Sequence, residues 1–405
     1  MPNTQDHAIQ VGFDTLAARP FDEIDALILT QLIYIPMEGL ADRGERVTIR
    51  ELGAFLRSEA MEGDADHFQK KRISLALIAA GVPRYQDWVI HNYESIIDIE
   101  REMQFAACCF EMPGVGQTFI AFRGTDWSLA GWKEDFNMSF MTVPSQREAV
   151  EYVERVVRET GDSLMLGGHS KGGNLSVYAG LRVNLSTQER IRRVYCFDGP
   201  GVDKETLDSL EYELLQERIE SYLPQSSIVG MLLYYHPVYT VVHSGSRGIM
   251  QHDALSWQVE DGKFVTLQGV DFTGRLTDEA LHRWLKEVDK ESRRELVDTL
   301  YAVLESTQMD SMDEMLANWK DSLRCMWGAV GNLEPEMRKK MMHLLTLLFA
   351  AGASGTLRSL LPHVKMQLEE PMKTPEALRR LRFFINGEIE NPQDSGEESF
   401  LALEE

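Results

Sequence analysis

The chain has 405 residues, 43% of them hydrophobic and 9% aromatic, which is enough for a large folded domain and a second region. Its formal net charge of −23 argues against nucleic acid and anionic membrane surfaces as partners. The N-terminus lacks the basic and apolar parts of a signal peptide, and no run reaches the roughly 18–20 apolar residues of a transmembrane segment. The four cysteines show no disulfide or metal spacing. We therefore expect a cytoplasmic protein with buried free thiols and no metal or other cofactor.

The first third of the chain predicts helices followed by strands. Residues 1–20 are expected to be a flexible N-terminus, and residues 21–37 carry apolar side chains at helical spacing. A capping box, Thr-Ile-Arg-Glu at residues 48–51, predicts a second helix, and a third is expected around residues 72–80. Two strands should follow, at residues 105–112 and 117–122, and then a helix capped at Ser145.

Strands and helices then alternate, which predicts an α/β fold with a mainly parallel sheet covered by helices. The strands are residues 163–166 and 193–197, and a hairpin over residues 256–267 closes the domain. Beyond about residue 275 the pattern is helical, with capping boxes at Ser292 and Ser311 and an apolar run at residues 341–349. We therefore predict an α/β-hydrolase-like domain, an all-helical C-terminal domain and an acidic tail, over residues 21–274, 275–385 and 386–405.

Residues 168–172, Gly-His-Ser-Lys-Gly, lie between a predicted strand and a predicted helix. In that context the pattern is typical of a nucleophile elbow, a sharp turn that exposes a serine at the end of a central strand. Ser170 is therefore the candidate nucleophile for acyl transfer. The alternative interpretation is an ordinary glycine-rich turn.

Acyl transfer needs two hydrogen-bond donors for the oxyanion. One donor would be the backbone N–H of Lys171, and Thr125, in the Arg-Gly-Thr segment after an earlier strand, would supply the other. A tight turn with a structural arginine explains that segment equally well.

The general base should follow the serine in the chain. His252, in the segment Gln-His-Asp at residues 251–253, is favoured, followed by His243, and His236 is a further competitor. His169 is adjacent to Ser170 in the turn, so its imidazole is poorly placed to act as the base.

Several motifs together resemble a known family. They are Phe-Arg-Gly-Thr at residues 122–125 with Trp132 and Asp135, Gly-His-Ser-Lys-Gly-Gly at 168–173, and Cys-Phe-Asp-Gly-Pro-Gly at 196–201. They resemble the class 3 lipases, which are α/β-hydrolases that cleave carboxylic esters. Residues 21–32, Lys171 and the segment at 251–257 are closer to the Mbeg1-like proteins, a bacterial hydrolase-like group formerly described as a domain of unknown function. The resemblance covers about residues 20–270 and implies the same roles for Ser170, His252, Thr125 and Lys171.

The chain departs from the lipase pattern at the triad acid. The segment Ser-Ile-Val-Gly at residues 227–230 has Ser227 where the class 3 lipases have an aspartate. We predict that Asp198 is the acid, because it follows the strand after that of Ser170 and should emerge at the same sheet edge. Asp253 is less favoured, because the sequence neighbour of His252 reaches its imidazole poorly. Alternatively, Asp198 only caps its loop.

These residues predict a serine hydrolase that cleaves a carboxylic ester, with a lipid or another small acyl ester as its partner. A thioesterase or an amidase would use the same residues. The alternative of a different class is a weak or inactive hydrolase fold that serves as a binding or regulatory module, which the serine at position 227 favours. The sequence indicates no particular protein partner.

Overall fold

The structure is a computed structural model, which describes residues 2–58, 66–98, 100–125, 134, 137–138, 141–231, 233, 238–271, 290–306 and 319–339. Several sequence predictions lie outside these residues. They are the capping box at Ser311, the apolar run at residues 341–349, the acidic tail at 386–405, and the competitor His236.

A nine-stranded sheet forms the centre of the described chain, in the order β1-β2-β3-β4-β5-β6-β7-β8-β11. The strands β4 to β8 pair in parallel, while the strands outside them pair antiparallel. The predicted mainly parallel sheet is therefore parallel at its centre and mixed as a whole. The strands are β1 Arg46–Thr48, β2 Val89–Asp98, β3 Met103–Glu111, β4 Gln117–Phe122, β5 Ser163–His169, β6 Ile191–Phe197, β7 Ile219–Pro224, β8 Tyr239–Val242 and β11 Thr266–Leu267, with a separate hairpin of β9 Val259–Glu260 and β10 Lys263–Phe264.

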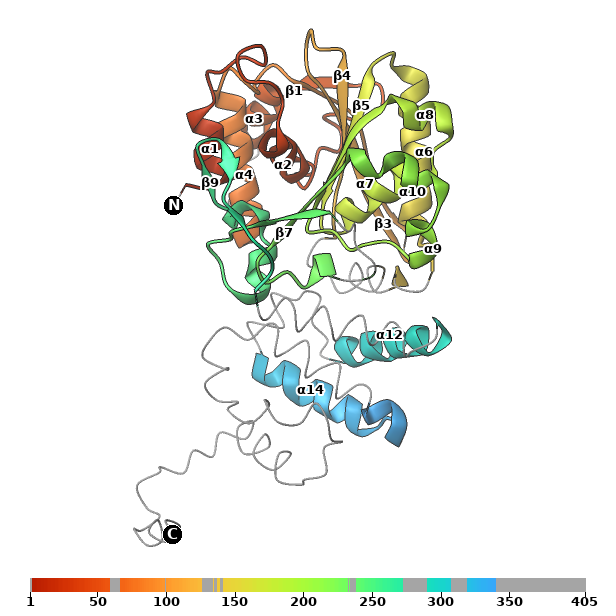
Figure 1. Ribbon diagram of the computed structural model, residues 1–405. Coiled ribbons are helices and arrows are strands. Elements are labelled where there is room, and N and C mark those ends of the chain that lie inside the picture. The colour runs from red at the N-terminus through yellow and green to blue at the C-terminus, as the bar shows by residue number, and fades with distance from the viewer. Residues whose placement is uncertain are drawn as a thin grey trace, which may run out of the picture.

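Helices cover both faces of the sheet, and each face has its own core (Figure 1). Successive side chains of a strand point to opposite faces. In β3, Cys108 and Phe110 therefore pack in one core, while Ala107 and Cys109 pack in the other. The first face carries α1 Thr4–Gln10, α2 Glu23–Leu32, α3 Ile49–Ser58 and α4 His67–Gly81; the second carries α6 Pro144–Glu159, α7 Lys171–Arg182, α8 Leu185–Arg190, α9 Lys204–Leu207 and α10 Leu210–Leu215.

Two helix starts can be compared with the caps that the sequence predicts. The Thr48 capping box is present, since the Thr48 N–H donates to Glu51 Oε2 (2.7 Å) and the Glu51 N–H donates to Thr48 Oγ1 (3.2 Å). Helix α6 instead begins at Pro144, before the predicted cap at Ser145. Proline suits the first helical position, and the Val143 N–H donates to Gln146 Oε1 (3.1 Å). The Ser145 N–H donates to Glu134 Oε1 (3.2 Å).

The N-terminal segment differs from the flexible one that the sequence predicts for residues 1–20. Helix α1 packs into the first core, and the Val259 N–H donates to the Pro2 carbonyl (3.0 Å). Arg84 forms a fully buried ion pair with Asp25 and also donates to the carbonyl of Asp14 (3.2 Å). A buried guanidinium must satisfy all its N–H groups, so it binds the segment that precedes α2.

Because of His7 in α1, we expect the protein to lose stability as the pH falls. Its ring is buried, both ring nitrogens lack a hydrogen-bond partner, and burial lowers the pKa of His7 from 6.5 to about 4, against an opposing effect of Asp22. Between these values only the unfolded chain binds the proton, so stability falls as pH falls, by about 1.4 kcal/mol per pH unit.

The variant His7→Leu should therefore be more stable than the wild type, and its advantage should grow as pH falls from 7 to 4.5. Urea unfolding at several pH values measures the difference, and His67→Leu controls for the loss of an exposed imidazole. A difference that stays constant with pH would contradict the burial of a neutral His7.

Two helices are described in the C-terminal region, α12 Lys290–Glu305 and α14 Trp319–Gly331, and they contact each other. Both lie within the stretch predicted to be helical. Across the described residues, we find no helix whose length and hydrophobicity would let it cross a bilayer.

Candidate active site

Ser170 lies on a tight turn between β5 and α7, at the carboxyl end of the central parallel strands. Its backbone has φ 60° and ψ −133°, a conformation that costs energy for any residue with a side chain. The Ser170 N–H donates to the Phe197 carbonyl at the end of β6 (3.0 Å). A Cβ added to Gly168 would lie 2.0 Å from the Gly172 oxygen. Any side chain at position 168 would therefore collide with the first turn of α7, so the turn requires glycine there. Strain of this kind is characteristic of functional sites.

The first turn of α7 directly follows Ser170. Lys171 is the first residue of this helix, so its N–H has no carbonyl partner within the helix. The Ser170 side chain does not cap the helix either. A free N–H at the positive end of a helix can stabilise a negative charge that develops beside Ser170.

The side chain of Lys171 is fully buried and points away from that N–H. Its Nζ donates to Glu134 Oε2 (2.8 Å) and to the Gln104 carbonyl (2.8 Å). Sequence analysis did not identify Glu134. From the sequence alone, Glu134 could be inferred only from the general rule that a buried lysine needs a carboxylate partner. This ion pair ties the turn to β3 and to the start of α6.

The loop after β4 contacts the Ser170 turn. The Gly124 N–H donates to the Tyr34 hydroxyl (3.1 Å), and a Cβ added to Gly124 would lie 2.5 Å from the His169 oxygen and 3.0 Å from Ser170 Cβ. Thr125 is the next residue, and its side chain is partly buried. Gly124 therefore contacts the Ser170 turn, and Thr125 follows it directly in the chain.

His252 and Asp198 form a short hydrogen bond across the loops that follow β6 and β8. His252 Nδ1 lies 2.6 Å from Asp198 Oδ2, and the Asp198 side chain is nearly inaccessible. Since a carboxylate oxygen accepts, Nδ1 is the donor in this hydrogen bond. Among the described residues, no hydrogen bond joins Ser170 Oγ to the His252 ring. Such contacts are often long in unliganded hydrolases.

The competing acid and base of the sequence analysis are engaged elsewhere. Asp253 pairs with Lys71 (2.6 Å) and accepts the Leu255 N–H (3.1 Å), so its carboxylate caps a short helix, η4 Ala254–Ser256. His243 Nδ1 donates to Gln258 Oε1 (2.7 Å). His252 lies at the end of another short helix, η3 Gly248–His252.

His169 links the turn to the histidine loop, a role that the sequence analysis missed. Its Nε2–H donates to the His252 carbonyl (2.7 Å), and the two rings lie 4.6 Å apart. Burial, with a further effect of His252, lowers the pKa of His169 well below its usual range. His169 therefore stays neutral, and its Nδ1 can accept from the Tyr34 hydroxyl (3.3 Å).

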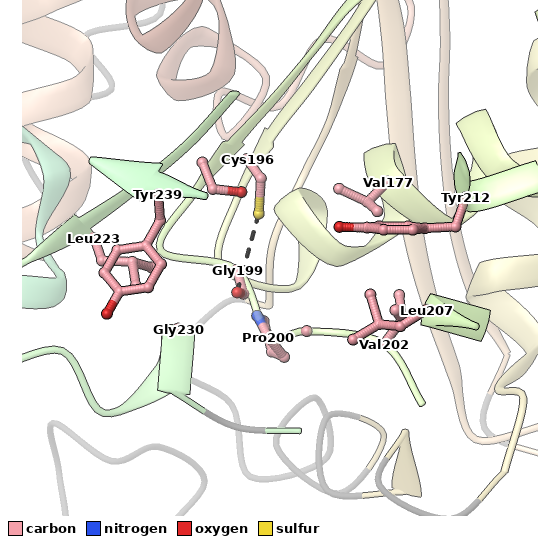
Figure 2. Close-up of a pocket in the computed structure, with 12 residues that line it drawn as sticks. Val177, Cys196, Gly199, Pro200, Val202, Leu207, Tyr212, Leu223, Gly230 and Tyr239 are labelled. Carbon is pink, nitrogen blue, oxygen red and sulfur yellow. Dashed lines mark hydrogen bonds between the residues drawn. The ribbon is translucent and has the colours of Figure 1, made fainter. Parts of the chain in front are cut away.

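A mostly apolar cavity lies beside α7, at the loop that follows β6 (Figure 2). Its empty space amounts to about 410 Å³ when the adjoining open solvent is included. Gly199, which follows Asp198, and Gly230 both line it, together with Leu223 of β7 and Val177 of α7. Ser170, His252 and Thr125 are not among its lining residues. The cavity is therefore lined by neighbours of Asp198 in the chain and in the turn after β7, and by none of the candidate catalytic side chains.

Within the described ranges, no three His, Cys, Asp or Glu side chains are grouped closely enough to hold a metal ion. The candidate site consists of a hydroxyl, an imidazole, a carboxylate and backbone N–H groups.

A family model described as Mbeg1-like matches residues 79–302, more than half of the chain, and a comparison with curated proteins finds no match. Among solved structures the chain is similar to M37 lipase (15% identity, 67% of this chain and 82% of that chain covered, TM-score 0.35). It is also similar to Lip2 lipase from Yarrowia lipolytica (11%, 44% and 82%, 0.31) and to a lipase from Rhizopus microsporus var. chinensis (14%, 62% and 89%, 0.32).

The topology of the sheet is that of the predicted fold. A serine follows a central parallel strand, and an acid and a histidine follow later strands of the same sheet. The chain therefore has an α/β-hydrolase-like fold, and it belongs to the Mbeg1-like family.

Proposed function

We propose that the protein is a serine hydrolase that cleaves a carboxylic ester, of a lipid or another small acyl compound, through an acyl-enzyme. The observation that carries the proposal is the 2.6 Å hydrogen bond between His252 and Asp198, held beside the strained turn at Ser170. A serine, a histidine and a carboxylate in this chain order are the groups that nucleophilic acyl transfer uses.

In the proposed reaction, Ser170 Oγ attacks the ester carbonyl carbon while His252 Nε2 takes the hydroxyl proton. The carbonyl oxygen becomes an anion next to the backbone N–H of Lys171 and the hydroxyl and backbone N–H of Thr125. The C–O bond to the alcohol then breaks, and His252 gives its proton to the leaving oxygen. Water then attacks the acyl-enzyme carbonyl in the same way, with His252 again taking and returning the proton. This step releases the carboxylic acid and restores Ser170. Asp198 stabilises the imidazolium that forms twice in the cycle.

The surroundings of His252 support this proposal. The His169 ring lies 4.6 Å from the His252 ring but stays neutral, so it brings no second positive charge next to the imidazolium. Its hydrogen bond to the His252 carbonyl also fixes the position of the histidine loop. We propose the cytoplasm as the location, because the cysteines are free thiols.

A second candidate function is a binding or regulatory module on a hydrolase fold. The observation in its favour is that Ser170 Oγ and the His252 ring share no hydrogen bond among the described residues. A module of this kind would need no proton transfer between them. Catalytic turnover separates the two candidates.

The test uses the purified full-length chain with p-nitrophenyl esters of increasing acyl length, and with matched thioesters and anilides. We expect release of p-nitrophenol well above the buffer rate for at least one ester. Hydrolysis at the buffer rate for every substrate would contradict the proposal and favour the module.

Thr125→Val tests the oxyanion role of the loop after β4. The substitution keeps the shape and the backbone N–H but removes the hydroxyl. We expect the turnover number to fall by on the order of 10²–10³, with little change in KM, because an oxyanion donor acts in the transition state. Thr118→Val, at the other end of β4, removes a hydroxyl that contacts Asp162 and is the matched control. An unchanged rate in Thr125→Val would restrict Thr125 to its backbone N–H.

A further inference from the structure

Ser227 lies in the turn that follows β7, next to the loop that carries Asp198. Its side chain is buried, and its Oγ lies 2.5 Å from Asp198 Oδ1. Its own N–H donates to the Pro224 carbonyl (3.0 Å), which anchors the turn to the end of the strand. Ser227 is thus fixed to the sheet by its backbone and to the carboxylate by its hydroxyl.

The two oxygens of the Asp198 carboxylate have separate partners. Oδ2 accepts from His252 (2.6 Å), while Oδ1 accepts from the Ser227 hydroxyl (2.5 Å) and from the Gly230 N–H (3.2 Å). The residue is fully buried, so it has no contact with bulk water. A buried carboxylate needs such donors on both oxygens. Together they prevent the carboxylate from rotating away from the imidazole.

Gly230 shows how closely the turn fits the carboxylate. A Cβ at this position would lie 2.6 Å from Asp198 Oδ1 and 2.9 Å from Ser227 Oγ. The Gly230 N–H also donates to Ser227 Oγ (3.1 Å). Since the Ser227 hydroxyl accepts from Gly230, its own proton is directed at Asp198. The turn after β7 is therefore a carboxylate-binding turn that serves a residue of the neighbouring strand.

Asp198 itself has a positive φ of 48°. Its N–H donates to the Tyr222 carbonyl of β7 (2.8 Å), so the strained backbone is held by the same strand that carries the turn. A non-glycine residue in this region persists only where its surroundings enforce it. Both its backbone and its side chain are thus bound by β7 and the turn after it.

We propose that Ser227 is a positioning residue, which holds the Asp198 carboxylate in the orientation that accepts from His252 Nδ1. The catalytic role of Ser227 rests on the proposed function, whereas its effect on the hydrogen bond between Asp198 and His252 can be measured without turnover. Ser227 has no contact with the reacting atoms. It acts through Asp198, which acts through His252.

The direct test is the low-field proton resonance of the His252 Nδ1–H, recorded by NMR on the full-length chain and assigned by its loss in His252→Gln. In Ser227→Ala we expect this resonance to broaden beyond detection or to move upfield, because Asp198 can then rotate. Ser176→Ala is the matched control, since it deletes another buried hydroxyl that bonds only backbone carbonyls. It should leave the resonance in place. An unchanged resonance in Ser227→Ala would overturn the proposal.

A double-substitution cycle adds the kinetic test. We expect Ser227→Ala to lower the turnover number about 10-fold with KM unchanged, since a hydrogen bond to a charged group is lost. In a chain that already carries Asp198→Ala, the same change should lower turnover less than about 2-fold, because Ser227 has nothing left to hold. Equal losses in both backgrounds would overturn the proposal. If the wild type shows no turnover, the proposed function fails, and the NMR test still decides the role of Ser227.

Discussion

Ser170→Ala should abolish nearly all ester turnover while the fold stays intact. We expect a loss of about 10⁵-fold or more, because no other group can form the acyl-enzyme and the residual rate comes from the oxyanion donors and binding alone. Initial rates on the best p-nitrophenyl ester measure the loss. The backbone at residue 170 is strained with or without the hydroxyl, so alanine should not change the thermal midpoint appreciably.

An unchanged rate in well-folded Ser170→Ala would remove Ser170 from the mechanism. Circular dichroism and the unfolding midpoint show whether the variant is folded. A large loss of rate in a variant that unfolds early would instead reflect damage to the α7 turn, so the two measurements are read together.

Asp198→Asn should lower the turnover number by on the order of 10⁴, with a smaller effect on KM. The carboxylate now accepts the Nδ1 proton of His252 at 2.6 Å. An amide nitrogen in that place would donate to Nδ1 and shift the proton to Nε2, so the imidazole could no longer act as the base. The rate should be measured at several pH values, since loss of the base lowers the whole profile.

Asp203→Asn is the matched control for this change. Asp203 lies in the same loop and caps α9 by accepting the Thr206 N–H (2.8 Å), a role that asparagine fills equally well. Turnover should stay within about 2-fold of the wild type. If Asp198→Asn behaved like Asp203→Asn, the carboxylate would be structural and the site would be a serine–histidine dyad.

The features that the sequence predicts best depend on neighbours in the chain. The Thr48 capping box is formed by residues three apart, and it is present. The predicted fold class is confirmed, because alternating strands and helices leave few topologies for a parallel sheet. That rule also explains why Ser170 and Asp198 could be placed on one sheet edge, since parallel neighbours end on the same side. Their catalytic roles stay predictions.

The features that sequence analysis missed depend on contacts between distant segments. Glu134 pairs with Lys171 in the interior, and the same carboxylate accepts the Ser145 N–H. Residues 2–20 are bound by partners far along the chain, since Val259 donates to the Pro2 carbonyl and Arg84 donates to the carbonyls of Asp14 and Arg19. Ser227 was interpreted only as a missing aspartate, because its hydrogen bond to Asp198 requires the spatial neighbourhood of β6 and β7.

The most direct measurement is covalent labelling of the purified chain with a fluorophosphonate, followed by peptide mapping. The reagent reacts with a serine only where a base and oxyanion donors activate the hydroxyl. Our account predicts one modified peptide that carries the label on Ser170, no label in Ser170→Ala, and strongly slowed labelling in Asp198→Asn. A chain that remains unlabelled, or that carries its label on a different serine, would contradict the assignment of Ser170 as an activated nucleophile.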